Sequence, residues 1–449
     1  MAGGSFTRIS GGANLALFNP DGSVDSSFNF TTTALGGVRV IAVQTDGKII
    51  IGGTFNRVNG VSRRFLARLN ADGSLDAAFN TDSIVGSPVR ALLLQPDGKI
   101  LVGGSFSIGS GVFPNIIRLN ADGTLDTTFT QGNVPGIRSI NSIALQTDGK
   151  IVVVWGTILP NRMPTGGIAR LNINGSVDTS FSNQISTLSF NSVAIQSNGK
   201  ILVGGQFSFG YVSSQTGSVL YNGILRLNPD GSHDTAFVPA TVSNDTRFTE
   251  VFALALQADG KILVGGRIFV GSSATPVGLA RLNSDGTLDA SLNSGAISIA
   301  TGFARVEDVL PLPDGKILIG GLFSDIRANP QMNSINIARL NADGSPDNSF
   351  SASTDNVVYD VALQTDGKIL IGGDFEIVNG VARSSLARLL SESTAVRRTR
   401  FDFDGDGKAD ISVFRPAGGM WYLLGSISGF TSFQFGVASD KLAPADYRR

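Results

Sequence analysis

The chain contains no cysteine and only one histidine among its 449 residues. The absence of cysteine rules out disulfides and thiolate chemistry. A single histidine nearly excludes the common transition-metal sites and catalysis by a serine–histidine or cysteine–histidine pair. That residue, His233, follows an Asp-Gly turn, and we expect it at the surface and not in a site.

Charged residues are also few, at 16% of the chain, and the formal net charge is -1. This balance gives no support to a nucleic-acid or anionic-membrane partner. The longest apolar run, residues 151–159, is interrupted by Gly156 and Thr157 and is too short to span a membrane. The N-terminus has no basic segment followed by an apolar run, so no signal peptide is expected. We expect a monomer that does not insert into membranes.

Glycine, in contrast, is abundant, with 56 residues, and it recurs at fixed positions of a repeat with a period of about 52 residues. The first half of a unit, as in ALLLQPDGKILVGGSF, places two apolar strands around an Asp-Gly turn. The second half, as in NIIRLNADGTLDTTF, has a strand, another Asp-Gly turn and a short strand ending in Phe. Asp-Gly between apolar strands is a strong hairpin signal, typical of a type I′ turn. Four strands per unit at this period predict a β-propeller.

An arginine and an aspartate recur on the two sides of the second hairpin, as Arg68 and Asp76 do. A three-residue loop would place them opposite each other, so we expect a cross-strand ion pair in each blade. A lysine follows each first turn, as Lys48 does, and we expect it to be solvated. The recurrence of these residues indicates a structural and not a catalytic role.

The two ends of the repeat array are incomplete in complementary ways. The first copy has Asp25 but no partner arginine, and the last copy has Arg388 but leaves the pattern at Leu390. Pairing these two ends would restore the ion pair and close a ring without exposed sheet edges. We therefore predict, for residues 1–390, an all-β, seven-bladed β-propeller of four-stranded antiparallel blades. An eight-bladed ring with an incomplete first blade, or a chain truncated at its N-terminus, are the alternatives.

The connections at the end of the blades opposite to the Asp-Gly turns vary in length, and variable loops on a rigid scaffold are where binding usually resides. Two neighbouring connections carry the best candidates for a ligand face. These candidates are Tyr211, Tyr221, Asn244, Asp245 and Arg247. The alternative is that these insertions are tolerated and bind nothing.

The pattern stops after Leu390, and residues 391–400 are predicted to form a polar linker. The segment FDFDGDGKAD that follows carries four aspartates at positions 1, 3, 5 and 9 of a loop, namely Asp402, Asp404, Asp406 and Asp410. Alternating carboxylates around a glycine turn, with the carbonyl of Lys408 at position 7, are the hard oxygen ligands that Ca²⁺ requires.

Position 12 of this loop is Val413, where an EF-hand has glutamate, and the flanking residues are strand-like, as Ile411 and Trp421 are. We therefore predict a calcium loop between β-strands and not an EF-hand. An Mg²⁺ site, or an acidic surface turn without an ion, are the alternatives.

Two families are similar to this chain. Residues 3–390 resemble the delta-60 repeat family, a bacterial β-propeller domain of unknown function, through QxDGKILVGGxF and LARLNxDGSxDxxF. Residues 401–449 look like one FG-GAP/VCBS-type repeat, truncated at its end, through DFDGDGKADISVFRP. The second resemblance implies that the four aspartates bind Ca²⁺, and together the two imply a secreted or cell-surface bacterial protein with adhesive or scaffold roles.

The sequence has no nucleophile elbow, phosphate-binding loop or metal-hydrolase helix motif. We therefore expect a non-enzymatic, extracellular or cell-surface interaction module whose propeller loops bind a glycan or a protein, followed by a calcium-binding repeat. One alternative is a propeller hydrolase or lyase that acts on a sugar or lactone through a divalent metal in the central channel. Another is a structural spacer in a longer surface protein.

Overall fold

The computed structural model describes residues 28, 30, 37–81, 86–104, 115–130, 139–158, 164–182, 185, 188–213, 217–239, 249–270, 275–292, 304–323, 336–379, 381–382, 386–390, 411–415, 420–425 and 429–434. The chain divides into two compact units, residues 1–392 and 393–449. Every regular element in the described part is a β-strand, which confirms the all-β prediction. None of the described residues forms a helix that could cross a membrane.

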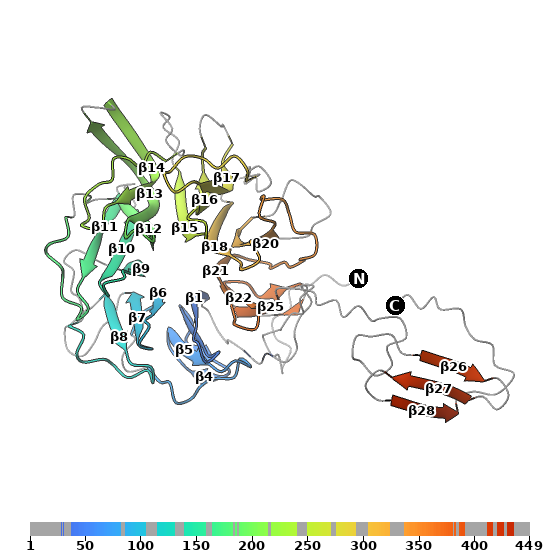
Figure 1. The fold of residues 1–449 in the computed structure, drawn as a ribbon. Coiled ribbons are helices and arrows are strands. Elements are labelled where there is room, and N and C mark those ends of the chain that lie inside the picture. Colours follow the sequence, from blue (N-terminus) through green and yellow to red (C-terminus); the bar gives the residue numbers. More distant parts are fainter. Residues whose placement is uncertain are drawn as a thin grey trace, which may run out of the picture. The chain divides into compact units, whose positions relative to one another are not determined.

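The described residues of the first unit form seven antiparallel meanders of three strands, placed side by side around a centre (Figure 1). The inner strands lie nearest the centre and are β1 Val38–Val43, β6 Val89–Leu94, β9 Ile140–Leu145, β12 Ser189–Ile195, β15 Glu250–Leu256, β18 Arg305–Pro311 and β21 Val358–Leu363. The middle strands are β2 Ile49–Gly53, β7 Ile100–Gly104, β10 Ile151–Ile158, β13 Ile201–Ser213, β16 Ile262–Ile268, β19 Ile317–Leu322 and β22 Lys368–Gly373. The outer strands are β5 Leu66–Leu69, β8 Ile116–Leu119, β11 Pro164–Leu171, β14 Gly217–Leu227, β17 Val277–Leu282, β20 Ile337–Leu340 and β25 Leu386–Leu390.

Two short hairpins, β3 Arg57–Val58 with β4 Val61–Ser62 and β23 Ile377–Val378 with β24 Val381–Ala382, interrupt the first and the last meander. Along the chain, each hairpin lies between the middle and the outer strand of its meander, and these two strands still pair with each other.

The hairpin between inner and middle strands differs from the predicted type I′ turn. In this turn of the first meander, only Gly47 has positive φ, at 81°. The Gln44 amide bonds to the Lys48 carbonyl, and the Gly47 amide to the Gln44 carbonyl. This is a three-residue loop that needs one left-handed residue. The Asp46 carboxylate accepts the Lys48 amide at 3.0 Å, which explains the aspartate before the glycine.

The predicted fourth strand is reduced to a single bridge, such as Leu69 with Leu75, in each of six copies. The chain turns immediately afterwards, because the Asp76 carboxylate accepts the Ala78 amide and the Asp76 carbonyl accepts the Phe79 amide. This turn sends Phe79 into the space between meanders, so the described meanders have three strands where four, the last of them short, were predicted.

The predicted arginine–aspartate pair is confirmed. The Nε of Arg118 lies 2.7 Å from the Oδ2 of Asp126, and both side chains are buried. Five further meanders carry an equivalent pair, formed by Arg68–Asp76, Arg170–Asp178, Arg226–Asp234, Arg281–Asp289 and Arg339–Asp347. The recurring lysine is not simply solvated, since the Nζ of Lys99 also contacts Asp126, at 2.8 Å.

The same arginine also connects neighbouring meanders. Its Nη1 donates to a carbonyl in the next meander, as Arg118 does to Ile173 at 2.7 Å. Its guanidinium lies over the ring of the recurring phenylalanine, with Arg118 4.7 Å from the centre of the Phe129 ring. One side chain therefore stabilises its own hairpin and the contact with the next one.

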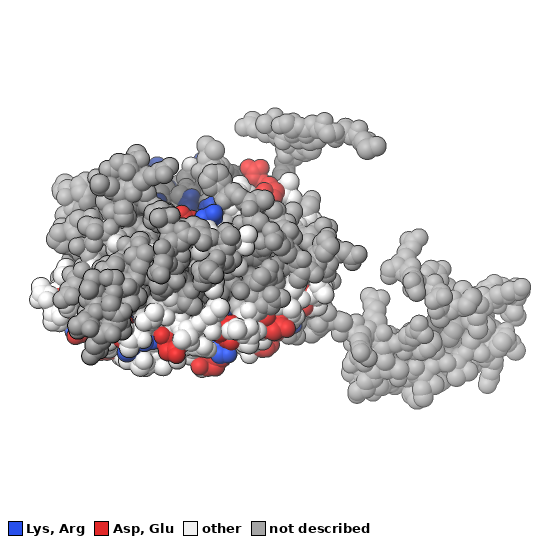
Figure 2. All heavy atoms as spheres, turned by 90° about the horizontal axis from the view of Figure 1, so that it is seen from above, with Lys and Arg blue, Asp and Glu red and all other residues white. Residues whose placement is uncertain are grey.

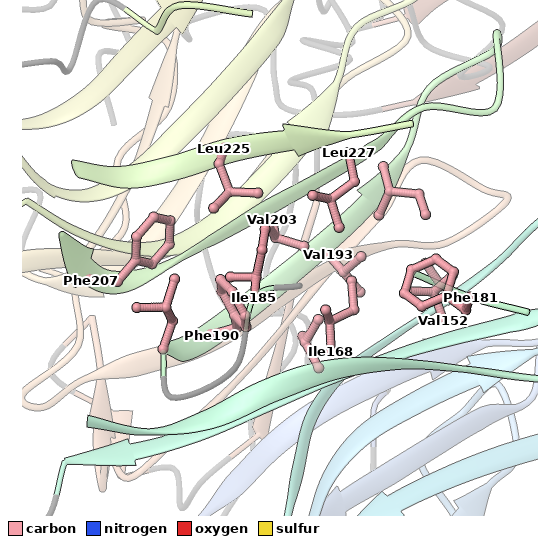
Figure 3. Packing of buried hydrophobic residues seen from close by; sticks show 14 of the residues in the cluster. Val152, Ile168, Phe181, Ile185, Phe190, Val193, Val203, Phe207, Leu225 and Leu227 are labelled. Atoms are coloured by element: carbon pink, nitrogen blue, oxygen red, sulfur yellow. The ribbon is translucent and has the colours of Figure 1, made fainter. Parts of the chain in front are cut away.

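The paired glycines of the middle strands allow this close packing, as predicted. A Cβ on Gly52 would lie 2.5 Å from Val89 of the next inner strand. Buried apolar side chains fill the remaining space between meanders. Figure 3 shows one such cluster, in which Val152 and Ile168 of the third meander pack with Val193 and Val203 of the fourth.

The first and the last meander pack together in the same way. A Cβ on Gly372 of β22 would lie 2.7 Å from Val38 of β1. Phe28 and Phe30 are buried in one cluster with strands of the first meander and Leu370 of the last. Asp25 and the Arg388 side chain lie outside the described residues, so their pairing stays a prediction.

The second unit contains one antiparallel sheet of β26 Ile411–Arg415, β27 Met420–Gly425 and β28 Gly429–Gln434. The first two of these strands confirm the predicted strands after the acidic loop. The loop itself, residues 401–410, lies outside the described part.

Candidate ligand-binding site on the inner strands

Each inner strand carries a β-bulge at the same position. In β1, Val38 pairs with Gly53 and Val40 with Gly52, which leaves Arg39 without a partner in the ladder. The other six inner strands skip one residue at the equivalent point. We call the seven skipped residues the bulge ring: Arg39, Arg90, Asn141, Asn191, Phe252, Glu307 and Tyr359. A bulge re-aims one side chain and is typical of strands beside functional sites.

The bulge ring does not follow the repeat. The residue before each bulge is buried and apolar in all seven strands, as Val38 and Val306 are. The bulge residue is instead basic twice, an amide twice, aromatic twice and acidic once. Because the meanders share their turn, glycine and ion-pair residues, folding a meander does not require this variation.

Arg39 and Tyr359 bring the first and last inner strands together. The guanidinium carbon of Arg39 lies 4.3 Å from the centre of the Tyr359 ring. The Tyr359 hydroxyl donates to Asp374 at 2.6 Å, and Arg39 lies 4.0 Å from the same carboxylate. Burial, followed by the bond to Asp374, raises the pKa of Tyr359 to about 12. The tyrosine therefore stays protonated at neutral pH and orients Asp374.

Glu307 is the acidic member of the ring, and its charge has a local partner. Its Oε1 accepts from the Nε of Arg305 at 2.6 Å. Burial raises the pKa of Glu307, although Arg305 and Arg39 act in the opposite direction. Arg305 also lies over the ring of Phe252, at 5.5 Å.

Arg90 is exposed and has no hydrogen bond or ion pair to the residues that the structure describes. Desolvation and the neighbouring positive charge of Arg39 lower its pKa. Since arginine titrates so far above neutrality, the side chain remains cationic at pH 7.

The two asparagines of the ring connect meanders. The Nδ2 of Asn141 donates to Phe190 of the next inner strand at 2.9 Å, and the Nδ2 of Asn191 donates to Val251 at 3.0 Å. This part of the ring therefore has a structural role besides any contact with a ligand.

The position after the bulge forms a second set of contacts between inner strands, which we call the seam. The hydroxyl of Ser192 accepts the Leu254 amide at 3.1 Å, and Ser142 serves in the same way one meander earlier. Asp308 accepts the Val361 amide at 3.0 Å, and Asp360 accepts the Ile41 amide of the first meander.

The carboxyls of Asp308 and Asp360 also influence each other electrostatically. Burial raises the pKa of both carboxyls, and the negative charge of Asp308 raises that of Asp360 further.

The structure revises two predictions from sequence. Tyr221, expected on a ligand face, is only 1% exposed and meets His233 edge to face, with 4.7 Å between ring centres. It belongs to the core. His233, expected at the surface, is half-buried against it, and burial lowers its pKa.

The other predicted site residues cannot be placed. Tyr211 lies in β13 but its side chain is outside the described part, as are the ligand-face candidates Asn244, Asp245 and Arg247. The calcium-loop residues Asp402, Asp404, Asp406, Lys408 and Asp410 are also outside it. Within the described residues, no group of three or more acidic or histidine side chains is arranged to hold a metal ion.

Sequence reasoning missed the bulge ring. The signal that would have revealed it lies in the comparison of copies, which read VRV, VRA, INS, FNS, VFA, VED and VYD at the start of the inner strands. A charged residue inside an otherwise apolar, repeated strand marks a position that the repeat does not constrain.

Solved structures show only distant likeness. A catalytically inactive virginiamycin B lyase from Staphylococcus aureus, with quinupristin, is 12% identical, with 76% of this chain and 95% of that chain covered and a TM-score of 0.44. A gluconolactonase from Xanthomonas campestris is 14% identical, with 70% and 95% covered and a TM-score of 0.35. PorZ, a surface component of the type-IX secretion system of Porphyromonas gingivalis, is 12% identical, with 92% and 61% covered and a TM-score of 0.39.

No curated protein matches the chain. A family model described as a domain of unknown function, DUF5122, beta-propeller, matches residues 1–28, 44–79, 95–129, 146–181, 196–237, 257–292, 312–350 and 364–395. These matches confirm the resemblance of the repeats to the delta-60 type of propeller. They cover more than half of the chain, which therefore belongs to the DUF5122 beta-propeller family.

Proposed function

We propose that this protein is a non-enzymatic interaction module that binds a glycan or protein ligand at the bulge ring. One observation carries the proposal. Seven equivalent bulges place seven side chains at one level of the inner strands, and these residues vary while the structural residues of the meanders repeat. Variation confined to one level of a rigid scaffold is the arrangement expected for ligand recognition.

We propose further that the seven meanders form a closed seven-bladed ring, completed by the N-terminal segment. The bond from the Ile41 amide to Asp360 supports this, because it joins the first and last inner strands as Asp308 and Val361 join two consecutive ones. Phe28 supports it as well. Its ring lies against Gly73 as the ring of Phe79 lies against Gly123.

In this proposal the protein acts outside the cell or at its surface, and the second unit is an FG-GAP/VCBS-type repeat whose loop binds Ca²⁺. The donor set fits that ion, since Asp402, Asp404, Asp406 and Asp410 offer hard carboxylate oxygens immediately before β26. A bound Ca²⁺ would neutralise these carboxylates and hold the loop against the sheet.

An array of glycans and bacterial surface proteins, probed with and without Ca²⁺, tests the binding proposal. The wild type is compared with Arg90→Ala and Phe252→Ala, which remove ring side chains from different meanders, and with Arg57→Ala, an exposed arginine outside the ring. We expect ligands whose signal is lost with a ring variant and kept with the control. Array signals that are the same for the wild type and for both ring variants would refute binding at the ring.

A hydrolase or lyase acting on a sugar or lactone is the second candidate, and the Asp308–Asp360 carboxyl pair favours it. Two interacting carboxyls with raised pKa values resemble an acid–base pair. Turnover of any array ligand that disappears in Asp308→Asn would favour the enzyme. A protein without ring-dependent ligands and without turnover would instead be a structural spacer.

A further inference from the structure

We propose that the bulge ring takes its ligand by an anionic group, a carboxylate or a phosphate, held between Arg39 and Arg90. This inference rests on the proposed function and specifies the chemistry of the ligand. The support comes from the placement of these two arginines, their partners and the charges of the rest of the ring.

The two guanidinium groups come from neighbouring strands at the same register. Arg39 is the bulge residue of β1 and Arg90 the bulge residue of β6, and the two strands are in contact. Their meanders are consecutive, so no other residue of the bulge ring lies between Arg39 and Arg90. Two like charges so placed repel each other, and an anion between them removes that cost.

The guanidinium of Arg39 is oriented by its neighbours, but they do not use all of its hydrogen-bond donors. Its guanidinium rests on the Tyr359 ring, and its contact with Asp374 is long, at 4.0 Å. About a third of its side chain is exposed, at 34%. A stacked guanidinium keeps its planar edge free to donate two parallel hydrogen bonds to a carboxylate or phosphate.

Arg90 supplies the uncompensated charge. It is exposed and, within the described residues, has no ion pair. The arginines of the six repeated ion pairs differ in this respect, since each of them contacts an aspartate within 2.8 Å, as Arg118 and Arg339 do. An ion pair within the meander explains the presence of those arginines, but it does not explain the presence of Arg90.

The acidic residues beside the ring compensate Arg39 in part, and none of the described ones forms an ion pair with Arg90. Asp374 lies 4.0 Å from Arg39, and Glu307 is bound to Arg305 while its charge also interacts with that of Arg39. Along the described lower edge of the first unit, acidic and basic side chains lie among uncharged ones (Figure 2). The uncompensated positive charge is thus that of Arg90, with the partly compensated Arg39 beside it. A small acid or an acidic sugar fits this site better than a long polyanion, since the whole chain has a net charge of -1.

Chemical modification of arginine tests the proposal on the full chain, and it does not require the natural ligand to be identified. Phenylglyoxal labelling of Arg90 is followed by peptide mass spectrometry in chloride and, at equal ionic strength, in galacturonate or inorganic phosphate. Maltotriose is the neutral sugar, and Arg57 is the exposed control arginine. At anion concentrations several times the dissociation constant, we expect labelling of Arg90 to slow about fivefold, while labelling of Arg57 does not change.

Two substitutions of Arg39 test whether this residue binds the anion together with Arg90. Arg39→Ala is expected to abolish the protection of Arg90, and Arg39→Lys to retain part of it because the charge is kept. Protection by galacturonate alone would assign a carboxylate ligand, and protection by phosphate alone a phosphorylated one. Equal slowing of Arg57, protection by maltotriose alone or no protection would overturn the proposal.

The outcome also separates this inference from the proposed function. If array binding is lost in Phe252→Ala but unchanged in Arg90→Ala, and no anion protects Arg90, the anionic ligand is refuted while ligand binding at the ring stands. If neither ring variant changes any array signal, the proposed function itself fails.

Discussion

At the scale of single residues, the repeat carries buried charge pairs whose hydrogen bonds offset the cost of desolvation. Asp126 accepts from Arg118, from Lys99 and from the amide and hydroxyl of Thr128. These bonds hold the pKa of Asp126 well below its ordinary value although its burial acts in the opposite direction. A buried carboxylate with this many donors is stable as an anion, but only while the partners are present.

Removing the buried partner is therefore expected to cost more than removing the exposed one. Arg118→Ala leaves Asp126 buried without its main cation and should lower the free energy of unfolding by about 3–5 kcal/mol. Lys99→Ala, at a side chain that is 31% exposed, should cost about 1 kcal/mol or less. Thermal and urea unfolding monitored by circular dichroism compare the two variants. Equal losses would contradict the assignment of the arginine as the structural partner.

At the scale of elements, a seam of polar side chains that follow four of the seven bulges joins neighbouring meanders. Serine is the acceptor at Ser142 and Ser192, and aspartate at Asp308 and Asp360. The geometry is shared, but only the aspartates can ionise. The seam between the last and first meanders is therefore sensitive to pH, whereas the serine seams are not.

The sign of this effect follows from the raised pKa of the carboxyl pair. In the unfolded chain these aspartates ionise near pH 4, at about 3.9, but in the folded protein they hold a proton to higher pH. The stability they contribute is present at acid pH and is lost as the pH rises through the folded pKa.

We predict that Asp360→Ser, which installs the acceptor of the other seams, flattens this dependence. Between about pH 4 and neutrality, the thermal midpoint of the wild type should fall relative to that of the variant. Ser192→Ala is the control, because it weakens a seam without changing the titratable groups. Parallel curves for the wild type and Asp360→Ser would show that the pair does not titrate as inferred.

At the scale of the whole molecule, the first and last meanders contact each other through side chains from both ends of the first unit. Phe28 is 2% exposed and lies against Gly73 of the first meander. Phe129, in the interior of the repeat array, is also 2% exposed and lies against Gly175. Comparing the stability that is lost when Phe28 or Phe129 is truncated tests whether the N-terminal segment closes the ring.

We expect Phe28→Ala to cost as much stability as Phe129→Ala, about 3–5 kcal/mol. In a closed ring both side chains leave equivalent cavities between meanders. In an open array, the segment around Phe28 would detach and its truncation would cost far less. Unfolding in urea, supported by limited proteolysis of the N-terminal segment, distinguishes the two results.

Calcium is expected to act on the second unit. In the full chain, millimolar Ca²⁺ should raise the melting temperature of the transition that belongs to the second unit, because unpaired carboxylates repel one another until an ion binds. Asp404→Ala or Asp410→Ala should abolish the gain, while Asp46→Ala, in an exposed turn of the first unit, should retain it. A melting curve of the wild type that does not respond to Ca²⁺ would count against the site.

Much of the fold could be predicted from local signals, and the candidate site could not. Asp-Gly turns, paired glycines and the Arg68–Asp76 pattern act within one hairpin or between adjacent strands, so their spacing indicates their structure. The fourth strand was overestimated because the bonds of Asp76 to the turn that follows it compete with a ladder. Tyr221 was assigned to the wrong environment because alternation on a strand does not distinguish solvent from a neighbouring meander.

The sequence by itself determined that this protein is a repeated β-structure in which an arginine faces an aspartate across a hairpin, since those features depend on contacts a few residues apart. Only the tertiary structure decided which side chains of different copies converge. A β-bulge of one residue changes the direction of Arg39 or Glu307, and no signal within one strand indicates which side chains of the other copies it will meet. The bulge ring combines strands that are far apart in the chain, and its charge balance exists only when they are brought together.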